Sequence, residues 1–250
     1  MSERDAMIEV RDLTMGWDDV ILQRNARFRV ERGEIFVILG GSGCGKSTLM
    51  RYLTGLEAPL AGEVLVKGGD PKLQTLGPPR FGVMFQSGAL LGSYTVGDNV
   101  ALPLTEWTDL PRDAVSAIVQ AKLRLVGMDH TEGLLPAELS GGMKKRAAIA
   151  RALALEPDLL FLDEPSAGLD PITAAELDEL IIALNRDLGL TVVVVTHDLD
   201  SIARIGQRCI MLDRETKSII AEGDPRRLRD ESSDPQVRAF FHRQPKDARS

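Results

Sequence analysis

The chain has 250 residues and a formal net charge of −7 at pH 7, with 44% hydrophobic and 27% charged residues. This composition is typical of a globular protein with one large domain or two lobes, and its acidic balance argues against general affinity for nucleic acid. No apolar run approaches the roughly 20 residues of a membrane span, and residues 1–9 lack the pattern of a signal peptide. Two cysteines, Cys44 and Cys209, have no metal-ligand spacing. We therefore expect a cytoplasmic chain in a reducing compartment.

Alternating apolar and polar residues between positions 7 and 30 predict short antiparallel strands. Trp17 falls in the turn region between them. An exposed aromatic side chain at this place could stack on a base, whereas an ordinary indole packs into a core. The residue pattern alone favours the packed indole and leaves both interpretations open.

The stretch GGSGCGKST at residues 40–48 fits the pattern G-x-x-x-x-G-K-[ST]. A buried-strand pattern precedes it and a helical pattern follows it, which is the arrangement that phosphate binding needs. Glycines let the backbone N–H groups point inward, Lys46 adds a full positive charge, and the Ser47 hydroxyl is suited to Mg²⁺. We expect this P-loop to bind a nucleoside triphosphate through Gly40, Gly41, Ser42, Gly43, Cys44, Gly45, Lys46, Ser47 and Thr48. We also expect alkylation of Cys44 to block ATP binding, because a thiol inside a P-loop is sterically close to the phosphate and is partly activated by the helix dipole.

Residues 81–85 predict a strand that delivers Gln86, whose amide oxygen is suited to a metal ion or a water molecule. Between about 95 and 136 the pattern is helical, with Asp98 near a helix start and a broad apolar face over residues 112–126. This block has no strand-like runs. It predicts a helical lobe inserted into an α/β core.

The sequence LSGGM at residues 139–143 leads into an amphipathic helix over residues 144–155. Ser140 as N-cap, with Gly141 and Gly142 after it, predicts a second helix N-terminus that is open to an anion. The basic residues at the start of the helix are expected to form a solvated face; they are Lys144, Lys145 and Arg146.

The run LLFLDE at residues 159–164 is four apolar residues followed by two carboxylates. A buried strand that ends in Asp163 presents this carboxylate at the edge where open α/β sheets bind ligands, which suits a magnesium ligand. Glu164 is placed to act as general base for an attacking water. Another buried strand, residues 191–196, delivers His197, and we expect this histidine to have a role in the site.

In this order the motifs resemble those of the nucleotide-binding subunit of an ATP-binding cassette (ABC) transporter: the P-loop, Gln86, LSGG, LLFLDE, SAGLD at residues 166–170, and His197. The resemblance implies an α/β fold, in which a P-loop ABC ATPase core carries an antiparallel β subdomain and an inserted α-helical subdomain. It implies an ATPase domain at residues 7–225, with the helical subdomain at about 95–155. Residues 226–250 are then a C-terminal tail, either a fraying terminus or an arm that docks on a partner.

The resemblance also implies Mg²⁺-dependent hydrolysis of ATP. The catalytic residues are then Glu164, His197, Lys46 and Gln86, and the metal ligands are Ser47, Gln86 and Asp163. Trp17 occupies the place of the family's adenine-stacking aromatic residue, which reverses the interpretation from residue pattern alone. Two such domains are expected to form a head-to-tail homodimer, with each ATP between the P-loop of one copy and Ser140, Gly141 and Gly142 of the other. Closing of this dimer on ATP and its opening after hydrolysis would couple the energy of ATP to a membrane partner.

Two longer stretches resemble the ATPase of Mla- or Mce-type lipid transporters, which move lipids between bacterial membranes: FGVMFQSGALLGSYTVGDNVALPL and LSGGMKKRAAIARALALEPDLLFLDEPSAGLDPI. Met143 departs from the glutamine usual in the broader family but suits this branch. The resemblance implies integral-membrane permease subunits, an Mce-type substrate-binding protein, a STAS-domain regulator and a peripheral location on the cytoplasmic face of the inner membrane. Tyr94, Val96 and Leu102 are the residues expected to contact the permease.

Two other functions fit parts of the pattern. A soluble ABC ATPase of iron–sulfur cluster assembly has one domain of similar size and a basic run after its signature, but the apolar residues after Gln86 and the Met143 signature argue against it. A non-catalytic nucleotide-binding module would not need an intact set of Lys46, Asp163, Glu164 and His197. We therefore expect a transport ATPase.

Overall fold

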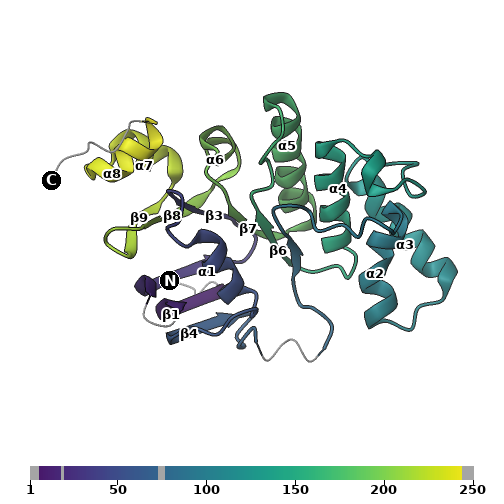
Figure 1. Ribbon diagram of the computed structural model, residues 1–250, viewed down its shortest axis with the longest axis horizontal. Coiled ribbons are helices and arrows are strands. Elements are labelled where there is room, and N and C mark those ends of the chain that lie inside the picture. The colour runs from purple at the N-terminus through teal and green to yellow at the C-terminus, as the bar shows by residue number, and fades with distance from the viewer. Residues whose placement is uncertain (1–5, 18–19, 73–76, 244–250) are drawn as a thin grey trace. The chain divides into compact units, whose positions relative to one another are not determined.

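The computed structural model describes residues 6–17, 20–72 and 77–243. The chain forms two compact units, the first from residues 1–73 and 193–250 and the second from residues 74–192. The second unit is therefore an insertion in the sequence of the first. Figure 1 labels most of the elements of both units.

An antiparallel sheet of three strands occupies the first unit, in the order β2–β1–β4. Its strands are β1 (Ala6–Trp17), β2 (Val20–Glu31) and β4 (Ala61–Val66). Val10 lies opposite Phe28 on β2 and Val64 on β4, so the apolar alternation of the sequence faces one core. The expected antiparallel strands are confirmed, although β1 and β2 are 12 residues each rather than short. Register shifts within the pair let both strands continue past the places where the alternation breaks.

A second set of strands in the first unit positions the P-loop. Its strand β3 (Ile35–Gly40) is buried along its whole length and pairs in parallel with β8 (Arg208–Asp213), which pairs antiparallel with β9 (Ser218–Gly223). Strand β7 (Thr191–Val195) leads into α6 (Leu199–Ile205), and α1 (Lys46–Leu53) follows the P-loop. The strand, glycine loop and helix predicted from residues 34–56 are confirmed.

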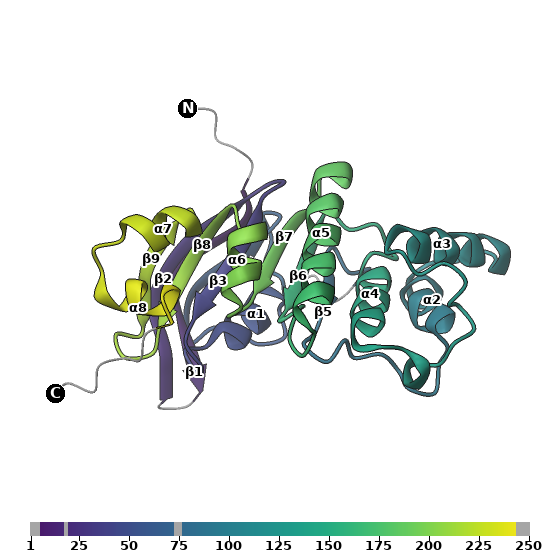
Figure 2. The ribbon, with the colours of Figure 1, turned by 90° about the horizontal axis from the view of Figure 1, so that it is seen from above.

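Two short helices, α7 (Pro225–Glu231) and α8 (Pro235–Phe241), complete the described part of the chain. The side chains of Val237 and Phe241 are buried in a cluster with Val37, Ile202 and Met211. Figure 2 shows both helices on the same side of β8 and β9 as α6. Residues 225–243 therefore pack onto their own unit, and the last residues of the tail lie outside the described ranges.

The second unit combines two parallel strands with helices. Strands β5 (Gly82–Met84) and β6 (Leu159–Asp163) pair in parallel register. The helices are α2 (Val96–Trp107), α3 (Arg112–Leu125), the 3₁₀ turn η2 (Pro136–Glu138), α4 (Gly141–Ala152) and α5 (Pro171–Leu188). Helices α2, α3 and α4 contact one another, which confirms the predicted helical lobe.

Local hydrogen bonds explain where two of these helices begin. Thr95 is the N-cap of α2 and exchanges hydrogen bonds with Asp98, so the helix begins before the aspartate rather than at it. The Ser140 hydroxyl accepts a hydrogen bond from the Met143 N–H, which confirms Ser140 as the N-cap, and α4 therefore begins at Gly141.

Candidate nucleotide-binding and catalytic site

The P-loop has the backbone that a phosphate cradle requires. Gly40, Gly43 and Gly45 have φ angles of 143°, 74° and 99°, which side-chain-bearing residues rarely adopt. A Cβ atom at Gly40 would lie 2.4 Å from the Leu212 carbonyl oxygen, so this position is also closed by contact. The motif therefore needs glycine at these positions for the positive φ angles, and at Gly40 also for the close approach of the Leu212 carbonyl oxygen.

The positive end of the loop is available to a ligand. Helix α1 begins at Lys46 and has no side-chain cap on its first N–H groups. The Lys46 ammonium donates hydrogen bonds to the carbonyl oxygens of Gly40, at 2.8 Å, and Gly41, at 3.1 Å. Ser42 and Ser47 are exposed. A charged side chain, uncapped N–H groups and accessible hydroxyls fit the oxygens of a triphosphate.

A buried glutamine outside the motif holds the P-loop from behind. The Gln23 side-chain amide donates hydrogen bonds to the carbonyl oxygens of Cys44 and Asp213, both at 2.9 Å. Gln23 is fully buried, although it lies on a strand whose neighbours are largely exposed. The motifs of the sequence do not single it out, and a polar residue at an inward-facing position of β2 is the signal that could have found it.

The structure corrects the expected reactivity of Cys44. Its side chain is 1% exposed, and burial raises the pKa of the thiol above its usual value despite the nearby Lys46 charge. The thiol is therefore buried and less acidic than usual, and the prediction of an activated cysteine is wrong.

Trp17, at the end of β1, is 48% exposed. The adjacent Gly16 is fixed because its N–H donates to the Tyr52 hydroxyl, which donates in turn to the Gly16 carbonyl oxygen. An exposed indole on a fixed strand end can stack on a flat ring. The residue pattern alone favours a packed indole for Trp17, and this prediction is wrong, since the side chain is exposed.

In the second unit, Asp163 ends β6 and Glu164 follows it. Each residue is 8% exposed. The backbone of Glu164 has φ = 48°, an uncommon left-handed conformation for a residue that is not glycine. Backbone strain of this kind is concentrated at functional sites, because the surrounding structure must hold it in place.

Lys145 is not part of a solvated face, contrary to our expectation for the basic run of α4. Its side chain is buried, and its ammonium donates to the carbonyl oxygens of Gln86, at 2.5 Å, and Glu164, at 3.1 Å. Arg146 is half-buried and donates to the carbonyl oxygen of Val126. The side chain of Gln86 itself is exposed just beyond β5.

The signature residues surround the start of α4. Ser140 and Gly141 are exposed, whereas Gly142 is buried, and a Cβ atom there would lie 2.5 Å from the methyl group of Thr173. Only a glycine at the second position lets α4 approach α5 this closely. The first turn of α4 is thus exposed on one side and packed on the other.

His197 follows β7 in the first unit and is exposed. The next residue, Asp198, is the N-cap of α6 and accepts a hydrogen bond from the Asp200 N–H. The histidine therefore lies between a buried strand and a fixed helix start, as the sequence predicts.

One of the three residues expected to contact a permease is not available. Val96 is fully buried, and its N–H donates to the Leu134 carbonyl oxygen, so this part of the prediction is wrong. Tyr94 is 42% exposed and Leu102 is half-buried. Other large apolar side chains of this segment are exposed, namely Phe85, Leu91, Trp107 and Leu110.

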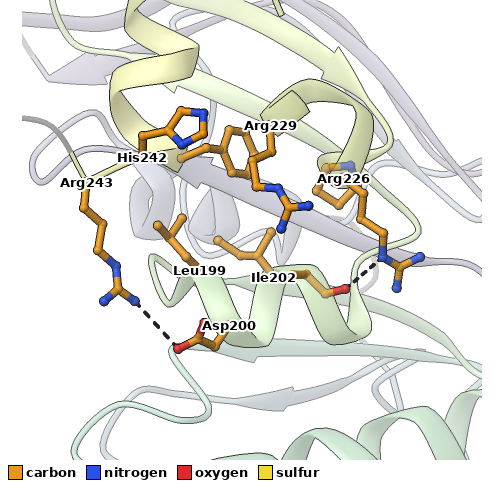
Figure 3. Close-up of a pocket in the computed structure, with 10 residues that line it drawn as sticks. Leu199, Asp200, Ile202, Arg226, Arg229, His242 and Arg243 are labelled. Atoms are coloured by element: carbon orange, nitrogen blue, oxygen red, sulfur yellow. Dashed lines mark hydrogen bonds and ion pairs between the residues drawn. The ribbon is translucent and has the colours of Figure 1, made fainter. Parts of the chain in front are cut away.

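A separate pocket of about 250 Å³ lies between α6, α7 and α8 (Figure 3). Its arginines already have partners: Arg226 donates to the Ala203 carbonyl oxygen, Arg229 pairs with Asp230, and Arg243 lies 3.7 Å from Asp200. None of the motif residues lines this pocket. It belongs to the packing of the C-terminal helices.

Within the described residues, no group of three or more His, Cys, Asp or Glu side chains could hold a metal ion. Magnesium does not need such a cage, because it is usually bound by one or two protein ligands together with substrate phosphates and water. The Ser47 hydroxyl and the Asp163 carboxylate are each the kind of oxygen that Mg²⁺ prefers. None of the described helices is long and apolar enough to cross a membrane.

Three kinds of comparison with known proteins agree with one another. Residues 23–167 match the ABC transporter family. The chain is 42% identical over 241 residues to the intermembrane phospholipid transport system ATP-binding protein MlaF of Escherichia coli strain K12, covering 94% of this chain and 88% of that one. Its fold matches cbiO1 of Clostridium perfringens, part of an ABC transporter complex, with a TM-score of 0.81 and 30% identity over 91% of this chain and 92% of that chain.

A second solved structure is an ATP-binding cassette in a dimeric, post-hydrolysis state bound to ADP and Pi. It matches with a TM-score of 0.77 and 30% identity, covering 87% of this chain and 98% of that chain.

Proposed function

This chain belongs to the ABC transporter ATPase family, and from this premise we propose how its residues bind ATP, hydrolyse it and pass on the energy. The chain is an ATP-binding ATPase that energises an ABC system for phospholipid transport. The observation that carries the proposed mechanism is the P-loop, whose glycine backbone, uncapped helix start and Lys46 ammonium fit a triphosphate.

In the proposed mechanism, the P-loop residues 40–48 and the exposed Trp17 bind the nucleotide, with the indole stacked on adenine. Lys46 moves from the loop carbonyls to the phosphate oxygens, which are the stronger acceptors because they are charged. Glu164 accepts the proton of the attacking water, and His197 orients the terminal phosphate.

We propose Ser47, Gln86 and Asp163 as the magnesium ligands. Hydroxyl, amide and carboxylate oxygens are the donors that this ion prefers. Magnesium would neutralise negative charge on the phosphates when it is bound. The protein's part is to hold the three oxygen atoms, one on α1, one after β5 and one at the end of β6.

ABC ATPases work as dimers, and a dimer of a similar cassette holds ADP and Pi. We propose a homodimer in which Ser140, Gly141 and Gly142 of one copy contact the ATP bound to the P-loop of the other. The exposed first turn of α4 supports this arrangement, because its N–H groups can reach an anion that belongs to another chain.

The membrane partners are permease subunits, as in other ABC transport systems. We propose that Tyr94 and Leu102, with the exposed apolar side chains of the same segment, form the contact with the permease. Their accessibility supports this role, since the segment leaves several large apolar side chains at least partly exposed. An Mce-type substrate-binding protein, a STAS-domain regulator and a peripheral position at the inner membrane are further parts of this proposal.

The iron–sulfur alternative is not favoured, because the chain is 42% identical to a phospholipid transport ATPase over nearly its full length. Affinity purification tests the choice directly. The tagged chain is isolated from gently solubilised membranes of its host, and the proteins and lipids that accompany it are identified by mass spectrometry. A polytopic permease and phospholipid are expected. Recovery only in the soluble fraction with iron–sulfur assembly proteins would overturn the transport assignment.

A pair of variants makes this experiment specific. Tyr94→Glu introduces a charge into the proposed permease contact and should remove the permease from the purified sample. Leu188→Glu, at a 51% exposed position on α5, introduces the same charge elsewhere in the second unit and should leave it. Equal recovery with both variants would place the permease contact on another surface.

A further inference from the structure

We propose that Lys145 is a positioning residue for ATP hydrolysis, whose ammonium group holds the main chain of the proposed base, Glu164, and ties it to the loop that carries Gln86. The inference rests on the proposed function of Glu164 and Gln86. It concerns a side chain that neither approaches substrate in the proposed mechanism nor belongs to the ligand set.

The geometry is that of a clamp within the second unit. Lys145 extends from α4, and its Nζ atom donates to the Gln86 carbonyl oxygen, at 2.5 Å, and the Glu164 carbonyl oxygen, at 3.1 Å. One atom therefore joins three elements: the helix that carries the signature, the loop after β5 and the loop after β6. A shift of α4 would change both hydrogen bonds, and a shift of either loop would change the bond that its own carbonyl oxygen accepts from Lys145.

The clamp acts where the backbone needs support. Glu164 has φ = 48°, and its carbonyl oxygen accepts both the Lys145 ammonium and the Ala167 N–H, at 3.2 Å. A left-handed conformation at such a residue persists only where neighbouring groups hold it. Because the Glu164 side chain leaves from this same backbone, its direction depends on the hydrogen bonds that hold the conformation.

Electrostatics distinguishes this lysine from an ordinary structural contact. The side chain is 7% exposed, and burial lowers the pKa of its ammonium group while the charges of Asp163 and Glu164 oppose that effect. A buried ammonium is costly unless opposite charges and acceptors surround it. Two carboxylates and two carbonyl oxygens provide them here, so the charge of Lys145 is matched to the acidic end of β6.

A neighbouring contact shows that holding the loop alone does not require Lys145. Arg151, also on α4, donates to the carbonyl oxygens of Gly88, at 2.7 Å, and Ala89, at 2.6 Å. That arginine already fastens the loop after β5 to the helix. What Lys145 adds is the second acceptor, Glu164, and hence a link between the loop and the proposed base.

The test compares variants of the full-length chain by steady-state ATP hydrolysis and by binding of a fluorescent ATP analogue. Lys145→Met keeps the length and removes the donors. We expect kcat to fall about 10- to 100-fold, because misplacing a reacting group by about an ångström has effects of this size. The Kd for the analogue should change less than about twofold, since the P-loop lies on other elements. Lys145→Arg should recover much of the lost kcat, because a guanidinium can donate to both carbonyl oxygens.

Lys144→Met is the matched control, since it removes the same charge one residue earlier from a half-exposed position. It should leave kcat, Kd and thermal unfolding unchanged. If Lys145→Met retains kcat within about threefold, or if Lys145→Arg is as slow as Lys145→Met, the inference is overturned. A kcat loss matched by an equal loss of nucleotide affinity would also overturn it, because that result indicates general damage to the fold.

Two further outcomes keep the inference separate from the proposed function. If Lys145→Met does not fold, Lys145→Arg and Lys145→Gln decide between the outcomes. A higher kcat for Lys145→Arg, which has more N–H donors than Lys145→Gln, supports the inference. Equal kcat values for the two variants overturn it. If the unmodified dimeric chain, reconstituted with its permease, hydrolyses no ATP, the proposed function fails. Hydrolysis by the unmodified chain with no effect of Lys145→Met removes only the positioning role.

Discussion

The P-loop and the loop after β6 are each held by one buried side chain that lies outside the residues expected to bind ligands, but the two side chains differ in charge. Behind the P-loop, the neutral amide of Gln23 donates to the carbonyl oxygens of Cys44 and Asp213. Behind the acidic loop, the ammonium of Lys145 donates to the carbonyl oxygens of Gln86 and Glu164.

The difference follows from the charge that each loop carries. The P-loop already has its positive group, Lys46, and a second buried cation behind it would add to that positive charge at a desolvation cost. The acidic loop has Asp163 and Glu164, whose charges stabilise the ammonium of Lys145. The positively charged P-loop is therefore held by a neutral donor, and the negatively charged loop after β6 by a positively charged donor. This difference predicts that damage to the acidic loop affects chemistry, and damage to the P-loop support affects stability and nucleotide binding.

Glu164→Gln should have the largest effect on turnover. The substitution keeps the shape of the side chain and removes the base, so we expect turnover to fall by a factor of about 10² to 10⁴. Nucleotide affinity should persist, because the P-loop is unchanged. Steady-state hydrolysis and equilibrium ATP binding measure the two effects separately.

The exposed Glu179 on α5 provides the control, since Glu179→Gln makes the same charge change without touching the loop. Rapid steady-state hydrolysis by Glu164→Gln would show that another group is the base. The acidic loop would then not be the part of the site that acts on chemistry, although the hydrogen bonds of Lys145 would remain.

Gln23→Met should have the next largest effect, and it acts on the P-loop instead of the acidic loop. Methionine fills a similar volume but leaves the carbonyl oxygens of Cys44 and Asp213 without this donor. An unsatisfied buried polar group costs about 1–3 kcal/mol, so we expect the free energy of unfolding to fall by about 2 kcal/mol. The KM for ATP should rise while kcat per bound nucleotide changes little. Denaturant unfolding and steady-state kinetics measure these quantities.

Gln120→Met, at an exposed position on α3, is the control and should be neutral. If Gln23→Met instead lowers kcat at saturating ATP and leaves the KM unchanged, the P-loop support acts on chemistry. The contrast between the two loops would then be wrong.

The elements of the fold can largely be predicted from the sequence because strand alternation, glycine loops and helix caps are local signals. The strand before the P-loop, the helical lobe and α3 over residues 112–125 are found where the pattern indicates them. The start of α4 at the Ser140 N-cap is also found where the sequence indicates it, whereas the start of α2 is predicted less accurately, since it depends on reciprocal hydrogen bonds between Thr95 and Asp98.

The residues that hold the site cannot be predicted in the same way. Lys145 lies in a basic run that is typical of a solvated helix face, and its burial follows from two carbonyl acceptors that are 59 and 19 residues away in the chain. The partners of Gln23 are similarly distant, at separations of 21 and 190 residues. Long-range acceptors leave no periodic signal in the sequence. The same reason explains Val96, whose apolar side chain is consistent with either a contact surface or a core.

The thiol of Cys44 should give the smallest effect, and it tests whether the P-loop support is rigid. Burial raises the pKa of this thiol, and burial raises the pKa of Cys209 to about 12. Since only the thiolate reacts with iodoacetamide, a raised pKa means less reactive thiolate at any given pH, and labelling becomes faster only as the pH rises toward the shifted value. At pH 7.5 both cysteines of the folded chain should therefore label several-fold more slowly than in the unfolded chain.

Peptide mass spectrometry after timed labelling distinguishes the two cysteines without further substitutions. In the Gln23→Met variant, Cys44 should label faster while Cys209 does not, because Gln23 donates to the main chain of Cys44 itself, whereas its other acceptor, Asp213, lies four residues from Cys209 at the end of β8. Equal acceleration at both cysteines would mean that Gln23 supports the whole unit rather than the loop. If neither site is accelerated, the P-loop is held in place by its own glycine geometry and the packing of Leu212, and the amide contributes stability without restraining the loop.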